Sequence, residues 1–323
     1  MTRPWLSVVM PTYNGERYLR ETFASLAEQD ERGFECVVVD GGSTDGTSDI
    51  IDEFARELDV RLFVRPEFPN WVGKTNFAFR EAAADHVCML HSDDRWLPGR
   101  AAAIRGALQR HPDVALVLNP SVLIDEEGRT VGRWRCPLEP EPTIYSADAL
   151  LEHLMVQNFV AIPAPVFRRD AALAVGGIDP LLWYTGDWDF YLKLARTGTT
   201  LYLDEMLTSF RLHGSSLTMT GSANLDAFRV QLETVLDRHI PAIESPSRRR
   251  AVRRVGAVSN AIDIALAAAV HGSWTRLPGA MASLAALGPL GWHSYFRNSR
   301  IVERVASRLR ARGNLFAVKQ AET

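Results

Sequence analysis

Short apolar runs alternate with amphipathic stretches through the first 120 residues of the chain. The apolar runs have the length of buried strands, and they are WLSVVM (5–10), FECVVVD (34–40), VRLFVR (60–65), HVCML (86–90) and DVALVLNP (113–120). The stretches between them carry apolar residues three or four positions apart, as helices with one buried face do, and they are residues 15–29, 46–58, 73–84 and 97–111. Strands that alternate with crossover helices predict an α/β protein with a mostly parallel sheet, covered by helices on both faces.

The pattern changes in the second half of the chain. DEEGRTVG (125–132) is typical of a hairpin turn, AIPAPVF (161–167) predicts a strand and WDFYLKLART (188–197) predicts a helix. From about residue 222 the pattern is helical, and no strand-like run follows. The sequence therefore predicts two units, an α/β domain over residues 1–221 and a helical C-terminal region over residues 222–323.

Composition and charge narrow the class of protein. A hydrophobic content of 46% and a charged content of 23% in 323 residues are typical of a globular protein with a sizeable core. The net charge of -3 argues against a nucleic-acid partner. Residues 241–323 hold 13 Lys and Arg against 4 Asp and Glu, so a basic tail follows an acidic body. Such a tail is expected to have a surface or partner of its own.

Cysteine usage and hydropathy predict a cytosolic protein. The three cysteines are Cys36, Cys88 and Cys136. No CxxC or Cys/His spacing occurs, so we expect reduced core residues and no disulfide or zinc site. The N-terminus turns polar too quickly for a signal peptide. Asn260 and Asp263 interrupt the apolar stretch 255–270, so no membrane span is predicted.

Three polar clusters follow predicted strands. They are PTYN (11–14), DGGSTDGT (40–47) and HSDD (91–94). The carboxyl ends of parallel strands meet at one edge of a sheet, where ligands bind in such folds. Asp, Asn, Gly and Ser also form turns, so each cluster taken alone could be only a turn. Three clusters at successive strand ends favour a binding site.

The carboxylates in these clusters suggest two kinds of ligand. Asp40 can only accept hydrogen bonds, which suits the N3–H of uracil or thymine or the donors of guanine and disfavours cytosine. Asp93 and Asp94 suit Mg²⁺ or Mn²⁺, which bind through one or two carboxylates plus substrate phosphates. Alternatively, Asp94 mainly caps a helix that begins near Leu97, and Asp93 alone binds the metal.

The order of these motifs resembles the inverting glycosyltransferases of family 2. YTGDWDFYLKLA (184–195) resembles the family's segment with the catalytic base, usually Glu-Asp before an aromatic helix. FRLHGSSLT (210–218) resembles its downstream histidine segment. The resemblance covers roughly residues 5–215. It implies a GT-A fold, a Rossmann-like and mostly parallel sheet flanked by helices, here with a C-terminal helical appendage, and it implies a nucleotide-sugar donor and a divalent cation.

The resemblance also implies residue roles. Asp187 would be the catalytic base. The metal, Mn²⁺ or Mg²⁺, would be held by Asp93, His213 and Asp94. The donor would be bound by Pro11, Thr12, Tyr13, Asn14, Asp40, Gly41, Ser43, Asp45, Lys74, Ser92, Asp93 and Arg211. Within this set Lys74 and Arg211 could reach phosphate. For Lys74, a surface position is the simpler interpretation, because its Gly-Lys-Thr lacks the preceding glycines of a P-loop.

Two positions depart from the family pattern. His91 stands where the family often has the first Asp of Asp-x-Asp, and it is equally well explained as a packed histidine. Gly186 stands where Glu is common, which removes a partner of the acceptor. The aromatic residues around Asp187 suit either stacking on a sugar or core packing, and they are Trp183, Tyr184 and Trp188.

The segment RIVERVASRLRAR (300–312) predicts a basic helix. Arginines recur every fourth residue along one face, and the neighbouring stripe is apolar: Arg300, Arg304, Arg308 and Arg312 beside Ile301, Val305 and Leu309. Such a helix could lie on the inner face of an anionic membrane. The alternatives are a helix packed on the catalytic domain with a solvated charged face, and a homodimer contact.

The function predicted on this basis is inverting transfer of a sugar from a nucleotide-diphosphate donor, with UDP- or dTDP-sugars favoured. The acceptor would be a saccharide, lipid-linked or small-molecule hydroxyl in polysaccharide, lipid-linked glycan or glycosylated-metabolite biosynthesis. The main alternative is a non-catalytic glycosyltransferase-like protein that binds nucleotide or a partner. A nucleotidyltransferase is disfavoured because no Gly-rich loop with Arg or Lys follows the first strand.

Overall fold

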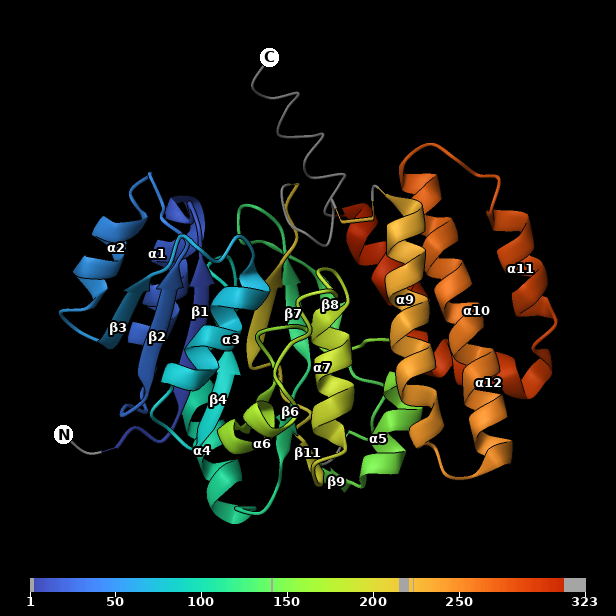
Figure 1. Ribbon diagram of the computed structural model, residues 1–323, viewed down its shortest axis with the longest axis horizontal. Coiled ribbons are helices and arrows are strands. Elements are labelled where there is room, and N and C mark those ends of the chain that lie inside the picture. The colour runs from blue at the N-terminus through green and yellow to red at the C-terminus, as the bar shows by residue number, and fades with distance from the viewer. Residues whose placement is uncertain (1–2, 141, 215–220, 223, 311–323) are drawn as a thin grey trace.

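The computed structural model describes residues 3–310 except residues 141, 215–220 and 223 (Figure 1). A large sheet has the strand order β3-β2-β1-β4-β10-β6-β11-β9, and a small sheet has the order β5-β12-β7-β8. The strands are β1 (Ser7–Thr12), β2 (Glu35–Asp40), β3 (Asp59–Val64), β4 (His86–Met89), β5 (Arg95–Trp96), β6 (Leu116–Leu118), β7 (Ser121–Ile124), β8 (Thr130–Trp134), β9 (Thr143–Tyr145), β10 (Val166–Arg168), β11 (Thr200–Tyr202) and β12 (Thr208–Arg211).

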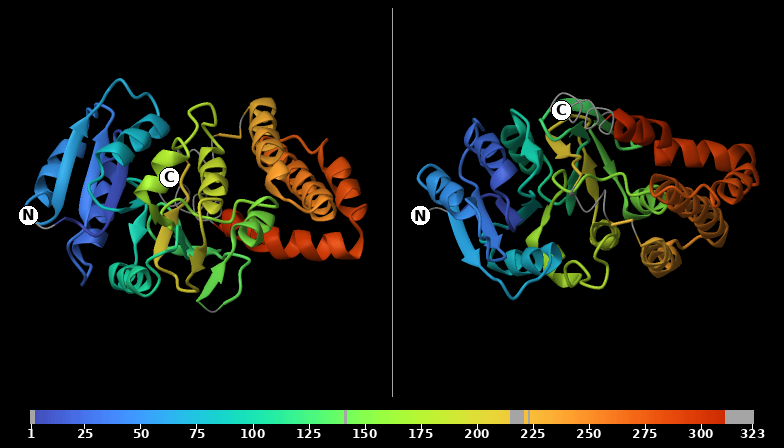
Figure 2. Two further views of the ribbon diagram at one scale, coloured as in Figure 1. Left: turned by 60° about the horizontal axis from the view of Figure 1, so that its bottom comes forward. Right: turned by 90° about the horizontal axis from the view of Figure 1, so that it is seen from above.

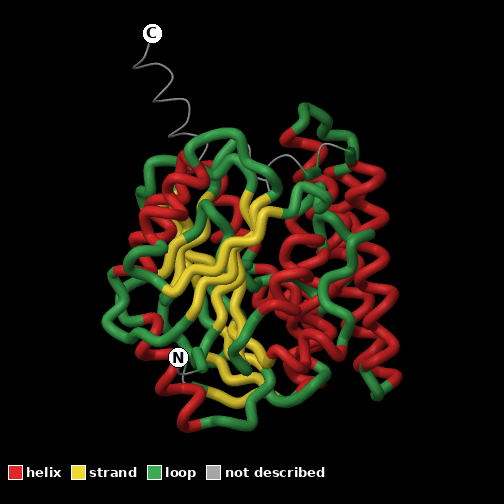
Figure 3. Tube along the Cα trace, turned by 60° about the vertical axis from the view of Figure 1, so that its left-hand side comes forward, coloured by secondary structure: helices red, strands yellow, loops and turns green. Residues whose placement is uncertain are grey.

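Helices cover both faces of the large sheet, as Figure 3 shows with strands in yellow and helices in red. The helices are α1 (Glu16–Ala27), α2 (Thr47–Phe54), α3 (Trp71–Glu81), α4 (Arg100–Arg110), α5 (Ala147–Leu154), α6 (Arg169–Ala174), α7 (Gly186–Ala195), α9 (Leu225–His239), α10 (Pro246–Val270), α11 (Leu277–Ala285) and α12 (Gly288–Ser299). The predicted α/β class with a mostly parallel sheet and a C-terminal helical part is confirmed.

The first four strands form the parallel part of the sheet. β1 pairs with β2 on one side and with β4 on the other, and the register aligns Thr12 with Asp40. Alternate residues enter two different cores. Val9 and Val37 pack on the side of α3 and α7, whereas Val8 and Val38 pack on the side of α1 and α4. Burial on both faces explains why β1 and β2 read as continuous apolar runs, whereas the edge strand β3 has no fully buried residue.

The second half of the large sheet is mixed. β10 runs antiparallel to both neighbours, β4 and β6, so the crossover pattern did not predict its direction. The strand predicted over residues 161–167 is also shorter than expected, because it begins only at Val166. Pro163 and Pro165 have no N–H to donate to a ladder, which accounts for the late start. The hairpin predicted at DEEGRTVG is confirmed, since β7 pairs antiparallel with β8 across it.

Helix α4 begins at Arg100, later than the predicted start near Leu97. The residue before its first turn is Gly99, whose φ of 78° lies in the left-handed region that favours glycine. Asp94 lies too far upstream to cap this helix, so the capping role proposed for Asp94 is wrong. Its carboxyl instead accepts a hydrogen bond from the backbone of Arg211 at 3.0 Å.

Among the described residues after β12, regular structure is helical, with one 3-10 turn at Ile240–Ala242. Both views in Figure 2 place these helices at the end of the molecule opposite β1–β3. Phe228 and Val235 of α9 join the same apolar core as α5 and α7. The division at residues 221 and 222 stays a prediction.

The predicted basic helix is described as far as residue 310, and Arg312 lies outside the described residues. Within the described part, Arg304 forms an ion pair of 3.0 Å with Asp263 of α10, and Arg300 pairs with Glu303. Arg304 therefore faces the protein. Membrane contact or dimer contact through this helix stays a prediction. None of the described helices is both long and apolar enough to cross a bilayer. All three cysteines are free and buried, as predicted.

Candidate active site

The polar clusters at the ends of β1, β2 and β4 come together at one edge of the sheet. The carbonyl oxygen of Thr12 accepts hydrogen bonds from the backbone N–H of Gly41 at 3.0 Å and from Nζ of Lys74 at 2.9 Å. Asn14 accepts a hydrogen bond from the backbone of Thr44 through its side chain. The backbone carbonyl of Ser92, in the third cluster, accepts from Thr22 of α1. Pro11 is buried in β1 just before these contacts.

Asp40 shapes its own loop. It is buried, and Oδ2 accepts hydrogen bonds from the backbone N–H groups of Gly42 at 3.0 Å and Ser43 at 2.8 Å. The Ser43 hydroxyl donates to the other carboxylate oxygen. The carboxylate thus holds the glycine-rich turn in place. Most of its hydrogen-bonding capacity faces inward, so base recognition by Asp40 stays a prediction.

Asp45 plays a similar part at the start of α2. Its Oδ1 accepts from the backbone and hydroxyl of Thr47, and its Oδ2 accepts from the backbone of Glu16. Burial opposes ionisation here, but the hydrogen bonds from Thr47 and Glu16 outweigh it and lower the pKa of Asp45. Asp45 therefore ties α1 to α2 below the loop. Its predicted contact with a donor stays a prediction.

Lys74 is buried rather than on the surface, which corrects the simpler interpretation of its motif. Its Nζ lies 5.5 Å from the ring centre of Tyr13, and Tyr13 is exposed. Burial lowers the pKa of Lys74, while Asp40 opposes that shift. A Cβ atom at Gly41 would lie 2.8 Å from this Nζ, so a side chain there would displace the end of Lys74. Tyr13, Gly41 and Lys74 thus form one contiguous group at the edge of the sheet.

Asp93 and His213, which the resemblance assigns to the metal, lie in contact, and their role as metal ligands stays a prediction. Asp93 Oδ2 lies 2.8 Å from His213 Nε2, although the two residues are 120 positions apart. Burial would raise the pKa of Asp93, but the hydrogen bond from His213 and the nearby His91 outweigh it and lower that pKa. Residues 215–218 of the histidine segment lie outside the described residues. The pair joins the third strand-end cluster to the end of β12.

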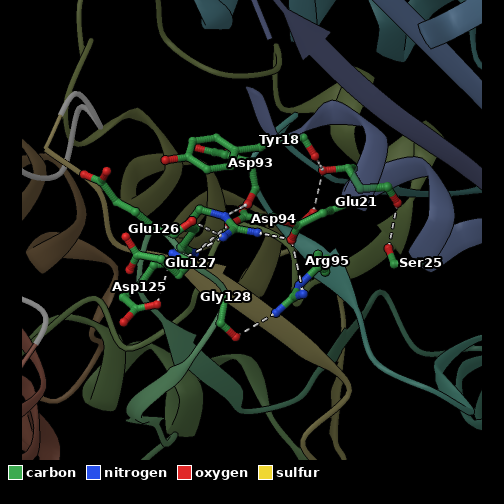
Figure 4. A network of polar contacts seen from close by, with 12 residues as sticks. Tyr18, Glu21, Ser25, Asp93, Asp94, Arg95, Asp125, Glu126, Glu127 and Gly128 are labelled. Atoms are coloured by element: carbon green, nitrogen blue, oxygen red, sulfur yellow. Dashed lines mark hydrogen bonds and ion pairs between the residues drawn. The ribbon is translucent and has the colours of Figure 1, made fainter. Parts of the chain in front are cut away.

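Asp94 and Arg211 are both buried. Figure 4 shows the polar network around Asp93 and Asp94. Burial, and then the neighbouring Asp93, raise the pKa of Asp94 well above its usual value. Arg211 donates to the carbonyl oxygens of Asp93, Asp125 and Glu126 and forms an ion pair with Glu21 at 2.7 Å. Arg211 was predicted to face the donor. In the structure its guanidinium is enclosed and braces the backbone around Asp93.

The metal prediction can be tested against these side chains. Asp93 and His213 offer a carboxylate and an imidazole at one point, both of which Mn²⁺ accepts as ligands. Within the described part of the chain, no group of three or more His, Cys, Asp or Glu is arranged to hold a metal ion by itself. The residues fit an ion that takes its other ligands from a diphosphate and water. Asp94 is buried against Arg211, and its role as a ligand stays a prediction.

Asp187 lies in the first turn of α7 and is half-buried. Its Oδ2 accepts a hydrogen bond of 3.1 Å from the Asn158 side chain, and its Oδ1 accepts one of 2.7 Å from the backbone of Trp188. Burial nevertheless raises the pKa of Asp187 to about 6. A carboxyl with that pKa is mostly ionised at neutral pH and is still basic enough to accept a proton.

Trp71 links the segment of Asp187 to the HSDD cluster. Its indole N–H donates to the carbonyl oxygen of Trp183 at 3.4 Å, and its ring packs edge-on against His91 at 5.4 Å. Burial lowers the pKa of His91, which favours the neutral, packed histidine. Burial raises the pKa of the Tyr191 phenol well above its usual value, and the charges of Asp187 and then Asp94 add to that shift. Trp71 therefore joins the segment before Asp187 to His91 of the HSDD cluster, and a single site that holds both the base and the metal residues stays a prediction.

The remaining aromatic residues of this segment mostly pack. Trp188 is buried, and its indole N–H donates to the carbonyl oxygen of Leu154 at 2.8 Å. Tyr184 packs edge-on against Phe228 of α9. Trp188 therefore packs in the core and is not placed to stack on a sugar. Gly186 also has a structural reason, because a Cβ there would lie 2.9 Å from Cγ2 of Ile178.

Helix α9 supplies supports that the sequence did not reveal. The amide oxygen of Gln231 accepts from the backbone N–H groups of Tyr184 and Thr185, just before Asp187. Two residues after Asp187, the buried Asp189 accepts from His239 and pairs with Arg238. Burial would raise the pKa of Asp189, but the hydrogen bonds from His239 and Lys193 hold it at about 2. These partners lie 46 to 50 positions away along the chain, so no local pattern signals them.

The model of the family described as "Glycosyl transferase family 2" matches residues 7–170. The chain belongs to this family. The matched range contains the three strand-end clusters but ends before Asp187 and His213. An uncharacterized glycosyltransferase of Nostoc sp. is 27% identical over 222 residues, which are 68% of this chain and 68% of that relative. TarS of Staphylococcus aureus, a poly(ribitol-phosphate) beta-N-acetylglucosaminyltransferase, is 36% identical over 118 residues, which are 34% of this chain and 20% of TarS.

Solved structures of glycosyltransferases share the fold of this chain. A fragment of S. aureus TarS in complex with UDP-GlcNAc aligns with a TM-score of 0.61 at 16% identity, covering 98% of this chain and 92% of that one. The mannosyltransferase PcManGT of Pyrobaculum calidifontis, in complex with GDP-Man and Mn²⁺, aligns with a TM-score of 0.52 at 19% identity, covering 96% and 88%. At these identities the likeness establishes the GT-A fold and leaves donor and acceptor open.

Proposed function

We propose that this family 2 glycosyltransferase inverts the sugar that it transfers from a nucleoside diphosphate donor, a UDP- or dTDP-sugar, to an acceptor hydroxyl. The observation that carries the proposal is the half-buried carboxylate of Asp187, next to the strand-end clusters of a family 2 glycosyltransferase. The TarS fragment that shares the fold binds UDP-GlcNAc, which supports a uridine donor here. The acceptor is a saccharide, a lipid-linked glycan or a small molecule, and the setting is the cytoplasm or the inner face of the membrane.

The donor is held at the carboxyl edge of the sheet in this proposal. The exposed ring of Tyr13 offers a face for the base, beside the loop that Asp40 holds through the N–H groups of Gly42 and Ser43. The buried ammonium of Lys74 lies 5.5 Å from the centre of the Tyr13 ring and attracts the negatively charged donor. These groups suit a nucleoside diphosphate, and the choice of a uracil or thymine base is supported by the acceptor-only carboxylate of Asp40 and by the UDP-GlcNAc complex of the TarS fragment.

A divalent cation, Mn²⁺ or Mg²⁺, would be held by Asp93 and His213. When bound, such an ion stabilises the negative charge that grows on a diphosphate leaving group. Arg211 fixes the backbone of Asp93 and thereby the position of its carboxylate. The Mn²⁺ in the PcManGT complex supports the choice of metal. The protein ligands are few because the donor's phosphates supply the rest.

The chemical step is a single displacement. Asp187 accepts the proton of the acceptor hydroxyl while the oxygen of that hydroxyl forms a bond to the anomeric carbon. The bond from that carbon to the diphosphate oxygen breaks, and its electron pair leaves with the nucleoside diphosphate. Attack comes from the face opposite the leaving group, so the anomeric configuration inverts. Asn158 stabilises the ionised form of Asp187 before the reaction, and Gln231 holds the segment that carries it.

The deciding experiment is calorimetric titration of the full chain with UDP, dTDP, GDP and CDP, each with Mn²⁺ and with chelator. We expect tight binding of UDP or dTDP that requires the metal and is lost in Asp93→Ala. Asp187→Asn is the matched control, because it should bind the same nucleotide and turn over none of its sugar derivatives. Tight binding of GDP or CDP instead would refute the donor choice, and equal binding with chelator would refute the metal.

A non-catalytic nucleotide-binding protein is the second candidate. It is favoured by His91 and Gly186, which replace two acidic residues of the family pattern, and Gly186 leaves no space for a side chain. If wild-type protein binds a nucleotide sugar but neither transfers nor slowly hydrolyses it, the second candidate replaces the first. Hydrolysis in wild type but not in Asp187→Asn would exclude it.

A further inference from the structure

Helix α11 lies at the outer edge of the C-terminal helices (Figure 1). Its nine residues include no Asp, Glu, Lys or Arg. Only Ala280 of its nine residues is buried. The exposed positions Pro278, Met281, Ala282 and Ala285 recur with helical spacing, and none of them can ionise. A surface helix ordinarily carries charged residues on its outer face. The outer face of α11 therefore lacks the charged residues expected of a helix face that contacts only water.

The next helix extends this apolar surface. Leu290 is 89% exposed, and Trp292 and Phe296 of α12 are also exposed. The indole N–H of Trp292 donates to the carbonyl oxygen of Leu284 at 2.7 Å, which places that ring against the end of α11. We call the set Met281, Leu290, Trp292 and Phe296 the α11–α12 surface. All four side chains are exposed on two consecutive helices, and Trp292 is the one whose contact joins α12 to α11.

Positive charge borders this surface. Arg254 of α10 donates a hydrogen bond to the carbonyl oxygen of Ala286, two residues from the carbonyl that Trp292 contacts. Arg250 lies one helical turn before Arg254 and is also exposed, and none of the ion pairs among the described residues involves it. The sequence from residue 264 to 302 contains three arginines and no Asp or Glu. Arg297 is paired with Glu139 and Arg300 with Glu303. Arg250, Arg254 and the exposed Arg276 at the start of α11 enter none of the ion pairs among the described residues.

We propose that the α11–α12 surface, with Arg250 and Arg254, docks the protein on an anionic lipid membrane. Indole rings and leucines enter the boundary between headgroups and acyl chains, and arginines at the rim attract anionic headgroups. A second copy of the chain fits less well, because a two-fold contact through this face would bring the same unpaired arginines together. This surface differs from the basic helix 300–312, whose Arg304 is already paired with Asp263.

The test is flotation of the full chain with vesicles, without nucleotide or acceptor. One vesicle is phosphatidylcholine, and the other is equal parts phosphatidylcholine and phosphatidylglycerol. We expect flotation with the anionic vesicles only, weakened at high salt. Met281→Glu and Leu290→Glu should each weaken partitioning by on the order of tenfold, because a carboxylate replaces a side chain that would leave water at the acyl boundary. Arg250→Gln with Arg254→Gln should weaken the preference for anionic lipid.

Leu173→Glu, at an exposed leucine on α6, is the matched control and should float like wild type. Thermal melting of each variant verifies folding, since exposed substitutions change stability little. Absence of flotation, or equal flotation of wild type and both Glu variants, would overturn the proposal. A dimer in light scattering that Leu290→Glu dissociates, without vesicle binding, would make this face a contact between copies. Each outcome is independent of sugar transfer, so the proposed function is tested separately.

Discussion

The ionisation of Asp187 gives the sharpest prediction about this protein. Burial raises its pKa to about 6, and the Asn158 amide donates to its Oδ2 at 3.1 Å. A base acts only when ionised, so kcat/KM should rise with pH through about 6 and reach a plateau near neutrality. Replacing Asn158 with Ala removes a donor that stabilises the ionised form. The pKa of Asp187 should therefore rise further in this variant.

The size of that shift follows from the hydrogen bond. A hydrogen bond to a charged group contributes about 1.5–3 kcal/mol, and water replaces part of it at a half-buried carboxylate. A net loss of about 1.4 kcal/mol corresponds to about one pKa unit. At pH 6 the ionised fraction should then fall from about one half to about one tenth, whereas at pH 8 wild type and variant should differ little.

The assay is release of nucleoside diphosphate from the donor identified by titration, measured as kcat/KM from pH 5 to 9. Gln157→Ala is the matched control, because Gln157 accepts from Ser259 and has no contact with Asp187 in the described structure. Its profile should coincide with that of wild type. If Asn158→Ala loses the same factor at every pH, or if wild type shows no rise between pH 5 and 7, Asp187 is not the base.

Three further predictions concern stability. Asp187→Asn should abolish transfer and raise the free energy of unfolding by about 1–2 kcal/mol at pH 8 but not at pH 3. The reason is that a carboxyl whose folded pKa is about 6 destabilises the fold increasingly as pH rises from 3.8 to 6. No gain in stability at pH 8 in urea denaturation would contradict this. Arg211→Leu should cost about 3–5 kcal/mol in the same assay, since three backbone carbonyl groups lose their donor and Glu21 keeps only Arg95 as a partner. Gly186→Ala should lower Tm, whereas Gly279→Ala, where a Cβ has open space, should not.

Much of the fold was available from periodicity. The first four strands and their helices were predicted because each is a local pattern with its own apolar face, and parallel order follows when a crossover helix joins each pair. The direction of β10 was not available. Its pairing with β4 and β6 joins segments about 50 to 80 residues apart, and a three-residue strand carries no signal of its own direction.

The site divides in the same way. Asp93, His213 and Asp187 were identified from motifs, and the structure brings Asp93 and His213 within 2.8 Å. Arg211 and Lys74 were placed towards phosphate or solvent, but both are buried. The identity of a charged residue in a sequence does not reveal whether its side chain is solvated or is buried against backbone carbonyl groups.

The sequence by itself predicted the first four strands, the helices that join them and the polar motifs at the strand ends, because these depend on neighbours a few residues apart. Only the tertiary structure decided how that chemistry is tuned. The pKa of Asp187 depends on burial and on Asn158, and its segment is held by Gln231 from a distant helix. The pKa of a group depends on its burial and on its hydrogen bonds, and most of the residues that bury it or bond to it come from remote parts of the chain.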